Sequence, residues 1–320
     1  MSATHLPLGP GSEFDTLRAT VARWGSIARG TGDDAALLDV PSGRHLVVST
    51  DTAVENVHFR KEWLTAEEIG YRAGAAAVSD LAAMGATPFA MVVALTLPES
   101  WRGRSLELAD GIACIARETE TPIVGGDLSS GAELSIGITV LGTVDHALTR
   151  DGARPGDTLW VTGRLGGPRG ALHAWQRGVS PFPEHRARFA HPSPRLREAR
   201  WLGAHGANAA IDISDGVASD AAHIAAASRM RLTIDLERLP RLDGTTPMDA
   251  ACSGEEYELL VCAPATLDAS AFEREFGIPI TAVGRVALPG AEGEGLDVRL
   301  HGERVDLPKG HDHFADHVAS

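Results

Sequence analysis

Residues 46–59 read LVVSTDTAVENVHF, and this stretch decides the fold class that the sequence predicts. Its first part, 46–49, is mostly apolar and β-branched and follows Gly43, which predicts a short buried strand that ends at Ser49. Thr50 and Asp51 come directly after it, and a loop carrying His58 follows. Hard oxygen ligands at a strand end suit Mg²⁺. The alternative is that Thr50 and Asp51 only cap a turn.

Further acids occupy similar places along the chain, at strand ends, in glycine turns or on a helix face of small residues. They are Asp34, Asp80, Asp127, Asp212 and Asp215. Most of them have a simpler interpretation as turn residues. Asp80 does not, because it lies in an Ala-rich helix predicted over 67–84, which opens with the capping box TAEE at 65–68. A carboxylate among alanines is costly to bury unless a cation meets it.

If several of these acids converge, their repulsion requires cations. Two carboxylates about 5 Å apart repel by roughly 3 kcal/mol at an effective dielectric constant of about 20. Several such pairs exceed the usual stability of a domain, which is about 5–15 kcal/mol. Oxygen-only ligands favour Mg²⁺ over Zn²⁺. The sequence therefore predicts a nucleotide site in which a polyphosphate is bound through Mg²⁺.

The composition excludes several classes of protein. The chain has 320 residues, 43% of them hydrophobic and 22% charged, which is typical of a globular protein of two domains. A formal net charge of −14 argues against binding to nucleic acid. No apolar run is long enough to span a membrane, and the N-terminus has no signal-peptide pattern. The three cysteines form no CxxC pair and are expected to be reduced, so we expect a cytoplasmic protein.

A cluster of turn residues at 151–157 (DGARPGD) predicts a boundary between domains 1–150 and 151–320. In the first domain the pattern favours an α+β fold with a ferredoxin-like sheet of order β-α-β-β-α-β, in which Gly125-Gly126-Asp127 forms a flexible turn after a short strand. In the second domain the pattern favours an α/β fold. Its glycine-rich turn at 163–170 matches neither common phosphate-binding motif and is weak evidence alone.

Seven strings recur in the order and spacing of one enzyme family. They are GDDAAL (32–37), STDTAVENVHF (49–59), SDLAAMGATP (79–88), GGDLS (125–129), ALTRDGARPGD (147–157), DISDG (212–216) and GEEYELL (254–260). With these strings the chain resembles the thiamine-monophosphate kinases, of the aminoimidazole ribonucleotide synthetase-like superfamily, from about Glu13 to Phe314. The resemblance implies an N-terminal domain that dimerises through its sheet. It also implies ATP-dependent phosphorylation of thiamine monophosphate to thiamine diphosphate.

The resemblance also implies roles for individual residues. The Mg²⁺ ligands would be Asp34, Ser49, Thr50, Asp51, Asp80, Asp127, Asp212 and Asp215. Five of these acids would carry catalysis: Asp34, Asp51, Asp80, Asp127 and Asp212. ATP would contact Gly126, Asp127, Arg150 and Ser214. The thiamine substrate would contact His58, Glu255 and His311.

Two other functions remain open. One is a different ATP-dependent synthetase of the same superfamily, acting on an aminoimidazole precursor, selenide or a carbamoyl group. The absence of cysteine from the N-terminal turns argues against the last two. The other is a non-catalytic nucleotide-binding protein, which would be expected to have lost one or more of the acids that this sequence retains.

Overall fold

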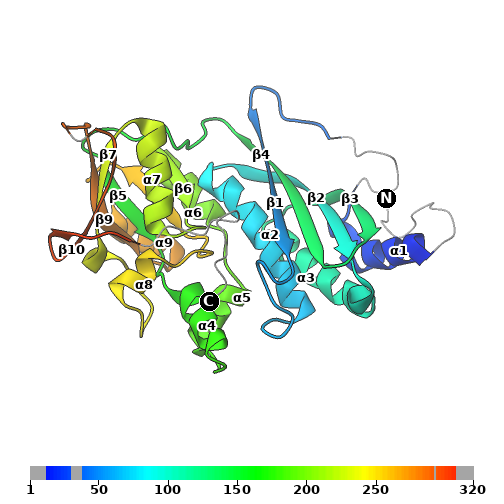
Figure 1. Cartoon of the computed structure of the whole chain (residues 1–320). Coiled ribbons are helices and arrows are strands. Elements are labelled where there is room, and N and C mark those ends of the chain that lie inside the picture. The colour runs from blue at the N-terminus through cyan, green and yellow to red at the C-terminus, as the bar shows by residue number, and fades with distance from the viewer. Residues whose placement is uncertain (1–11, 30–37, 292, 308–320) are drawn as a thin grey trace. The chain divides into compact units, whose positions relative to one another are not determined.

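The chain forms two compact units in a computed structural model that describes residues 12–29, 38–291 and 293–307 (Figure 1). The first unit comprises the chain up to Ala147 together with Ala190–Leu196. The second comprises Leu148–Phe189 and the chain from Arg197 onward. Two of the expected site residues, Asp34 and His311, lie outside the described residues.

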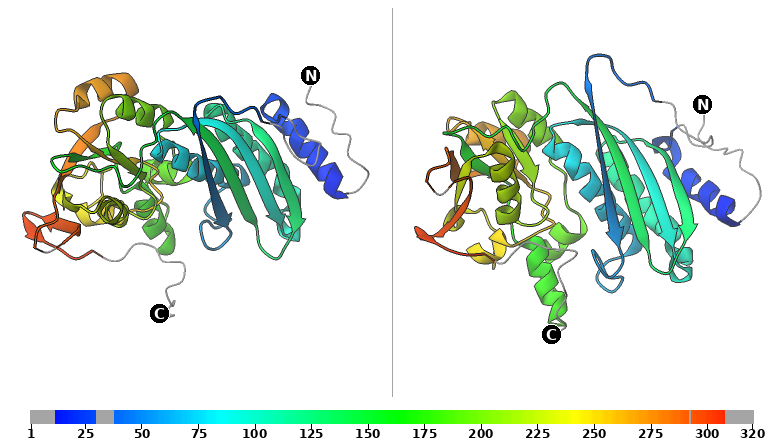
Figure 2. Two further views of the ribbon diagram at one scale, coloured as in Figure 1. Left: turned by 90° about the horizontal axis from the view of Figure 1, so that it is seen from above. Right: turned by 45° about the horizontal axis from the view of Figure 1, so that its top comes forward.

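The first unit is a four-stranded sheet in the order β1-β4-β2-β3, with helices α2 and α3 on one face (Figures 1 and 2). The strands run antiparallel except for the parallel pair β2–β3. Its elements are α1 (Ser12–Trp24), the 3₁₀ turn Gly25–Ile27, β1 (His45–Val54), α2 (Ala66–Ala83), β2 (Thr87–Leu97), the 3₁₀ helix Glu99–Arg104, α3 (Ser105–Glu118), β3 (Ile123–Ser130) and β4 (Ser135–Val144).

The predicted α+β class of this unit is confirmed, but the order of its elements differs from the prediction. The chain runs β-α-β-α-β-β instead of β-α-β-β-α-β. The reason is that β2 and β3 are parallel, so a helical crossover, α3, must join them. A tight connection then joins β3 to β4.

Two strands extend further than their sequences predict. Strand β1 does not end at Ser49, because its pairing with β4 continues to Val54 and places Asp51 opposite Ile138. Strand β3 likewise continues through Asp127 to Ser130, since it pairs with β2 over its whole length. Asp51 and Asp127 therefore lie within strands, where the sheet fixes their direction.

Helix α2 begins as the sequence predicts. The Thr65 backbone N–H donates to Glu68 Oε2 at 2.8 Å, and the Glu68 N–H donates to Thr65 Oγ1 at 3.2 Å, which completes the capping box. The helix then lies almost in backbone contact with α3. A Cβ added at Gly70 would lie 2.2 Å from the Leu108 carbonyl oxygen, and one at Gly111 would lie 1.9 Å from that of Glu67. Only glycine permits this approach.

The second unit is built on a seven-stranded mixed sheet in the order β11-β10-β7-β9-β5-β8-β6. Its described elements are β5 (Thr158–Thr162), α4 (Gly167–Gln176), α5 (Pro183–Ala190), α6 (Leu196–Ala204), β6 (Ala209–Asp212), α7 (Val217–Ser228), β7 (Arg231–Asp235), the 3₁₀ turn Leu236–Arg238, α8 (Pro247–Ala251), β8 (Leu259–Ala263), α9 (Ala269–Phe276), β9 (Ile280–Ala287), β10 (Gly295–Leu300) and β11 (Glu303–Arg304). Its core joins the central strands to α7 through Val161, Ile211, Ile224 and Leu260. Among the described helices of both units, none has the length and apolarity to cross a membrane.

The contact between α2 and α3 predicts a large effect of one methyl group. Gly111→Ala should lower the free energy of unfolding by about 2–3 kcal/mol, because the helix backbones must separate to admit the Cβ. Gly103→Ala is the matched control, since a Cβ there meets nothing within 4 Å. Urea unfolding of both variants measures the difference. Equal stabilities would show that the helices can separate without loss of packing.

Candidate active site

In the first unit the structure brings Ser49 and Asp80 together. Ser49 Oγ on β1 donates to Asp80 Oδ2 near the end of α2 at 2.5 Å. Both side chains are half-buried. The capped helix places Asp80 against the edge strand β1. Asp80 and Ser49, both candidate site residues from the sequence, are therefore in direct contact.

The sheet register separates the other candidates of this unit onto two faces. Asp51 shares a row with Ile138 and Val93, which are 1% and 2% exposed, so it lies on the helix-covered face with Ser49. Thr50 lies on the opposite face, where its Oγ1 is 2.6 Å from Thr139 Oγ1. Asp127 pairs with Ala94 on that same open face and is exposed.

Gly126 has a structural reason to be glycine. It pairs with Val93 of β2, and a Cβ at this position would lie 2.0 Å from the Val93 carbonyl oxygen. The tight pairing of β2 with β3 thus requires glycine here whether or not a nucleotide binds. The same contact fixes the direction of Asp127, the next residue.

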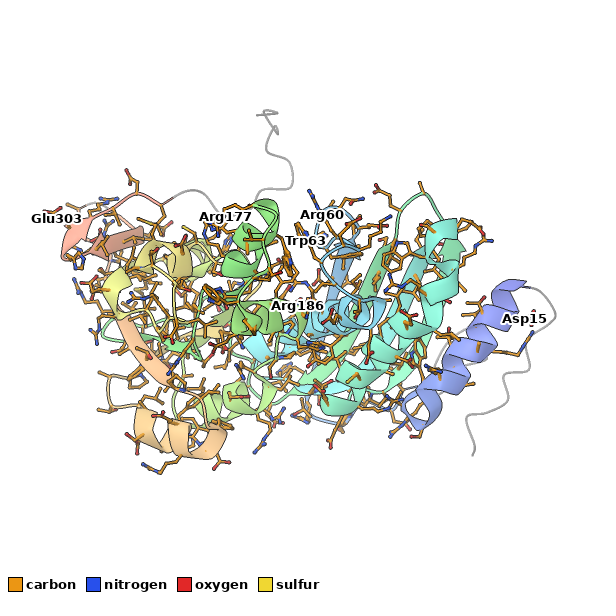
Figure 3. The ribbon with its side chains drawn as sticks, turned by 90° about the horizontal axis from the view of Figure 1, so that it is seen from below. Asp15, Arg60, Trp63, Arg177, Arg186 and Glu303 are labelled. Atoms are coloured by element: carbon orange, nitrogen blue, oxygen red, sulfur yellow. The ribbon has the colours of Figure 1, made fainter. Side chains whose placement is uncertain are left out.

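His58 stabilises the turn that follows β1. The Val54 N–H donates to His58 Nδ1 at 3.0 Å, which places the ring proton of a neutral imidazole on Nε2. In the same loop the Arg60 guanidinium lies over the Trp63 ring, 5.0 Å from its centroid (Figure 3). The loop that carries His58 is therefore held by its own side chains.

In the second unit three carboxylates gather where β6 leads into α7. Asp212 ends β6 and is buried, while Ser214 and Asp215 follow in the turn and are half-buried. Asp220, in the first turn of α7, is 1% exposed and accepts from the Asp215 N–H at 3.3 Å. Burial, followed by the charges of Asp212 and Asp215, raises the pKa of Asp220 to about 8. Gly216 begins α7 at φ +106°, a conformation that favours glycine.

The segment Gly254–Glu258, here called the acid loop, attaches to this turn. The Glu255 N–H donates to the Ser214 carbonyl oxygen at 2.6 Å, so the structure brings Glu255, Ser214 and Asp215 into one region. Glu255 itself is half-buried and has a φ of +58°. Arg150 lies elsewhere in this unit, with its side chain exposed and its carbonyl oxygen accepting from Ser228 Oγ at 2.7 Å.

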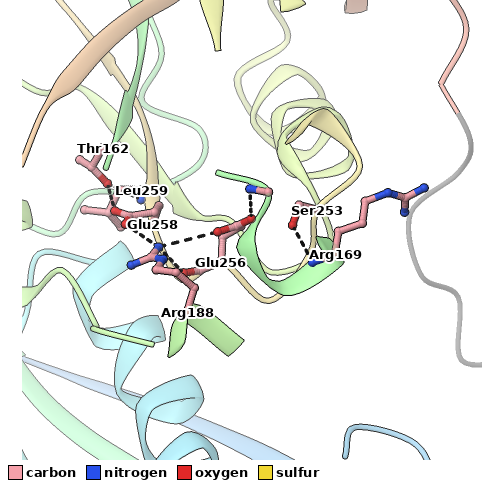
Figure 4. A network of polar contacts seen from close by, with 8 residues as sticks. Thr162, Arg169, Arg188, Ser253, Glu256, Glu258 and Leu259 are labelled. Carbon is pink, nitrogen blue, oxygen red and sulfur yellow. Dashed lines mark hydrogen bonds and ion pairs between the residues drawn. The ribbon is translucent and has the colours of Figure 1, made fainter. Parts of the chain in front are cut away.

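The glycine-rich turn at 163–170 has a packing explanation. A Cβ at Gly163 would lie 2.1 Å from Glu258 Oε1, and one at Gly170 would lie 2.2 Å from His185 Nδ1. The glycines admit the acid loop and helix α5. Two buried acids of the acid loop, Glu256 and Glu258, meet Arg188 of α5 there (Figure 4).

The donor chemistry of the site fits Mg²⁺. Within the described ranges, no three His, Cys, Asp or Glu side chains already form a group able to hold a metal ion. The candidates are nevertheless carboxylate and hydroxyl oxygens, which are the donors that Mg²⁺ prefers. The mutual repulsion of Asp212, Asp215 and Asp220 is the kind of strain that a bound cation relieves.

Comparison with known proteins places these residues in a family. Residues 32–144 match the model of the AIR synthase related protein N-terminal domain, and 154–293 match that of the C-terminal domain. Thiamine-monophosphate kinase of Escherichia coli K12 is 35% identical over 94% of this chain and 96% of its own length. The chain belongs to the thiamine-monophosphate kinase family. The relative from Rhodopirellula baltica is 36% identical over 84% of this chain and 87% of its own.

Solved structures of thiamine-monophosphate kinases share the two-unit architecture. That from Stenotrophomonas maltophilia K279a has a TM-score of 0.80 at 34% identity, over 92% of this chain and 98% of its own. A structure of AaThiL complexed with AMPPCP and TMP has a TM-score of 0.74 at 29% identity, over 94% and 96% of the two chains. Hydrogenase maturation protein HypE in complex with ATP has a TM-score of 0.79 at only 21% identity over 96% of each chain, which shows the shared fold alone.

The sequence reasoning missed Asp220 and Arg188. Asp220 carries the same signal that singled out Asp80, because it is an acid flanked by small residues in the Ala-rich first half of a helix. The sequence around Arg188 gives no such signal. Its two partners, Glu256 and Glu258, lie 68 and 70 residues later in the chain, so the contact arises only in the folded protein.

The buried carboxyl group of Glu256 should make the stability of the fold depend on pH. Burial raises its pKa from 4.5 to about 7, although the Arg188 charge opposes this. Between these values the folded protein keeps the proton and the unfolded chain loses it, so stability falls as the pH rises through this window. Glu256→Gln cannot ionise, so its stability relative to the wild type should increase by about 2–3 kcal/mol from pH 5 to pH 8.

Thermal unfolding across this pH range measures the effect. The exposed Glu303 lies in β11, the edge strand of the seven-stranded sheet (Figure 3). It supplies the control variant Glu303→Gln. Its profile should run parallel to that of the wild type. A Glu256→Gln profile that also runs parallel would contradict the assignment.

Proposed function

We propose that this chain phosphorylates thiamine monophosphate to thiamine diphosphate with ATP and Mg²⁺. The observation that carries the proposal is the identity of 35% to a thiamine-monophosphate kinase over 94% of the chain, with every expected acid of the motifs present. The AaThiL structure with AMPPCP and TMP supports the two substrates. The cysteines Cys114, Cys252 and Cys262 are free, in keeping with a cytoplasmic enzyme.

The acceptor needs no general base. It is a phosphate monoester whose second pKa is about 6, so it is largely dianionic at neutral pH. The obstacle is the repulsion between two polyanions, and catalysis consists mainly of neutralising and aligning them. The reaction is a direct in-line attack of an acceptor oxygen on the γ-phosphorus, which releases ADP without a phosphoenzyme.

Acids of the sequence motifs hold metal-bound phosphate groups. Residues proposed to bind Mg²⁺ are Asp34, Ser49, Thr50, Asp51, Asp80, Asp127, Asp212 and Asp215. Mg²⁺, when bound, neutralises charge on the polyphosphate oxygens. Ser49 donates to Asp80 and so orients its carboxylate. Thr50 and Asp127, on the open face of the sheet, contribute from the side that also carries the proposed dimer interface.

The remaining residues bind the organic parts and the phosphate tail. Arg150 has a permanent charge and a fork of donors suited to a phosphate group of ATP. Gly126 in β3 and Ser214 in the β6–α7 turn are proposed to contact the nucleotide. His58 donates through Nε2 to the acceptor phosphate. Glu255 faces the cationic thiazolium or the aminopyrimidine of the substrate, and His311 is proposed as a further substrate-binding residue.

Other members of the superfamily are the second candidates. A synthetase acting on an aminoimidazole precursor would share the fold and the ATP site. Against it stands the identity of 33–36% to three thiamine-monophosphate kinases over 84–94% of this chain.

The deciding experiment is ³¹P NMR of the purified protein with ATP, Mg²⁺ and thiamine monophosphate. Thiamine diphosphate should appear together with ADP. Inorganic phosphate without the diphosphate would indicate a synthetase with another acceptor. ATP binding without turnover would indicate a nucleotide-binding protein.

Asp80→Asn should lower kcat by about a thousandfold while the protein stays folded. The amide oxygen can still accept from Ser49, but it carries no charge. Asp145→Asn is the control, because that carboxylate is 71% exposed at the end of β4. Steady-state rates with saturating substrates measure the effect, and a wild-type kcat for Asp80→Asn would disprove the proposed metal site.

Glu255→Gln should raise KM for thiamine monophosphate about tenfold and leave KM for ATP unchanged, because only the thiamine moiety is cationic. The exposed Glu273 of α9 provides the control, Glu273→Gln. An equal rise in both KM values would show that Glu255 supports the structure of the site and does not contact the thiamine moiety specifically.

The open face of the first sheet is the proposed dimer interface. Leu46 and Val48 of β1 are 44% and 56% exposed on this face, opposite the face that α2 and α3 cover. A sheet face with exposed apolar residues is suited to pairing with a second copy through a twofold axis. The family resemblance implies the same surface.

Val48→Glu should therefore convert a dimer to a monomer, since it places a charge from each copy in the apolar interface. Light scattering during size-exclusion chromatography measures the mass. Val179→Glu, at a similarly exposed valine (53%) of the second unit, should leave the mass unchanged. A dimeric Val48→Glu protein would require another interface.

A further inference from the structure

The acid loop Gly254–Glu258 has a strained backbone. Glu255 and Tyr257 have φ values of +58° and +53°, in the left-handed region that non-glycine residues rarely adopt. Each such residue costs about 1–2 kcal/mol. Strain of this kind persists only where surrounding contacts enforce it, and it is concentrated at functional sites.

One side of the acid loop is held by backbone hydrogen bonds. The Glu255 N–H donates to the Ser214 carbonyl oxygen at 2.6 Å. The N–H groups of Glu256 and Tyr257 both donate to the Ile213 carbonyl oxygen at 3.0 Å. These bonds attach the loop to the turn after β6, but they leave its side chains to be fixed from elsewhere.

Arg188 of α5 holds the other side. Its Nη2 donates to Glu258 Oε1 at 2.6 Å and to the Glu256 carbonyl oxygen at 3.3 Å, and it lies 3.7 Å from Glu256 Oε2 (Figure 4). The Arg188 side chain is 18% exposed, while those of Glu256 and Glu258 are 0% and 1% exposed. One guanidinium thus contacts the loop on both sides of Tyr257.

The two glutamates are also bound to the strand and turn beside them. Thr162 Oγ1 donates to Glu258 Oε2 at 2.7 Å and accepts from the Leu259 N–H at 2.9 Å. The Gly166 N–H donates to Glu256 Oε1 at 2.5 Å. Arg188 therefore supplies a cation to a buried network in which Thr162 and the Gly166 backbone also donate.

We propose that Arg188 is a positioning residue for substrate recognition, which holds the acid loop in the strained conformation that presents Glu255 to the cationic thiamine moiety. The proposal rests on the proposed function, because Glu255 is assigned to the substrate there. Arg188 does not touch the substrate. A single nitrogen of its rigid guanidinium, Nη2, donates to both the Glu258 carboxylate and the Glu256 carbonyl oxygen.

The test uses variants of the full-length protein at Arg188, Glu258 and Arg197, together with E255Q. R188M removes the cation but keeps most of the apolar stem. Because it leaves buried carboxylates without a counter-ion, R188M/E258Q removes the Glu258 charge as well and keeps the bond from Thr162. R188K keeps the positive charge but replaces the guanidinium with an ammonium group. R197M is the control, since Arg197 is an exposed arginine that pairs with Glu275 at 3.8 Å and contacts the Phe276 ring, away from the acid loop.

Two readouts separate positioning from simple loss of stability. At a temperature where all variants are folded, R188M/E258Q should raise KM for thiamine monophosphate about tenfold and leave KM for ATP unchanged. Adding R188M/E258Q to E255Q should raise KM for thiamine monophosphate little further, since both changes remove the same contact with the substrate. Amide hydrogen exchange of residues 254–258 should accelerate, while that of α7 stays unchanged. R188K should fall between R188M and the wild type, and R197M should match the wild type.

The outcomes distinguish this proposal from the proposed function. Wild-type protein that forms no thiamine diphosphate overturns the function, whereas faster exchange in residues 254–258 would still show that Arg188 holds the loop. Active wild-type protein with an unchanged KM in R188M/E258Q overturns the positioning role. A full additive loss with E255Q overturns it too, because Arg188 would then act independently of Glu255.

Discussion

The near-contact of helix backbones in the first unit determines where its acids can lie. Gly70 and Gly111 allow α2 and α3 to approach closely, and the capping box of Thr65 and Glu68 fixes where α2 starts. With its start and its distance from α3 both set, α2 brings Asp80 to Ser49 fifteen residues after the cap. A looser helix pair would leave this carboxylate without its hydroxyl partner. The chemistry of the site thus depends on packing several turns away from it.

Charge in the second unit is organised differently. There the acids are buried and close to one another, at the β6–α7 turn and in the acid loop. Buried carboxylates are tolerated when they accept hydrogen bonds or meet a cation. The acid loop has both in Arg188, Thr162 and Gly166. In the Asp212–Asp220 region the Asp215 N–H donates to Asp220, and the carboxylates there are suited to a bound cation.

Local rules in the sequence predicted much of this structure. The capping box at 65–68 located the start of α2, and the sequence pattern indicated the two-unit architecture with its mixture of helices and strands. The same rules ended two strands too early, at Ser49 and just before Gly125, because strand length is set by the partner strand, which the local pattern does not contain. The acids of turns were identifiable one at a time. The partnership of Arg188 with Glu256 and Glu258 was not, since it arises only when α5 folds against the acid loop.

The left-handed backbone of Glu255 has a consequence for how this protein can change. Glycine at this position would adopt the same φ without the penalty of about 1 kcal/mol or more that a side chain incurs there. A directed-evolution campaign that rewards heat resistance alone would therefore favour glycine at 255, and with it a better-folded protein that has lost its carboxylate. With the proposed role of Glu255, stability and molecular recognition are opposed at this single position, so laboratory selection should keep both pressures in force.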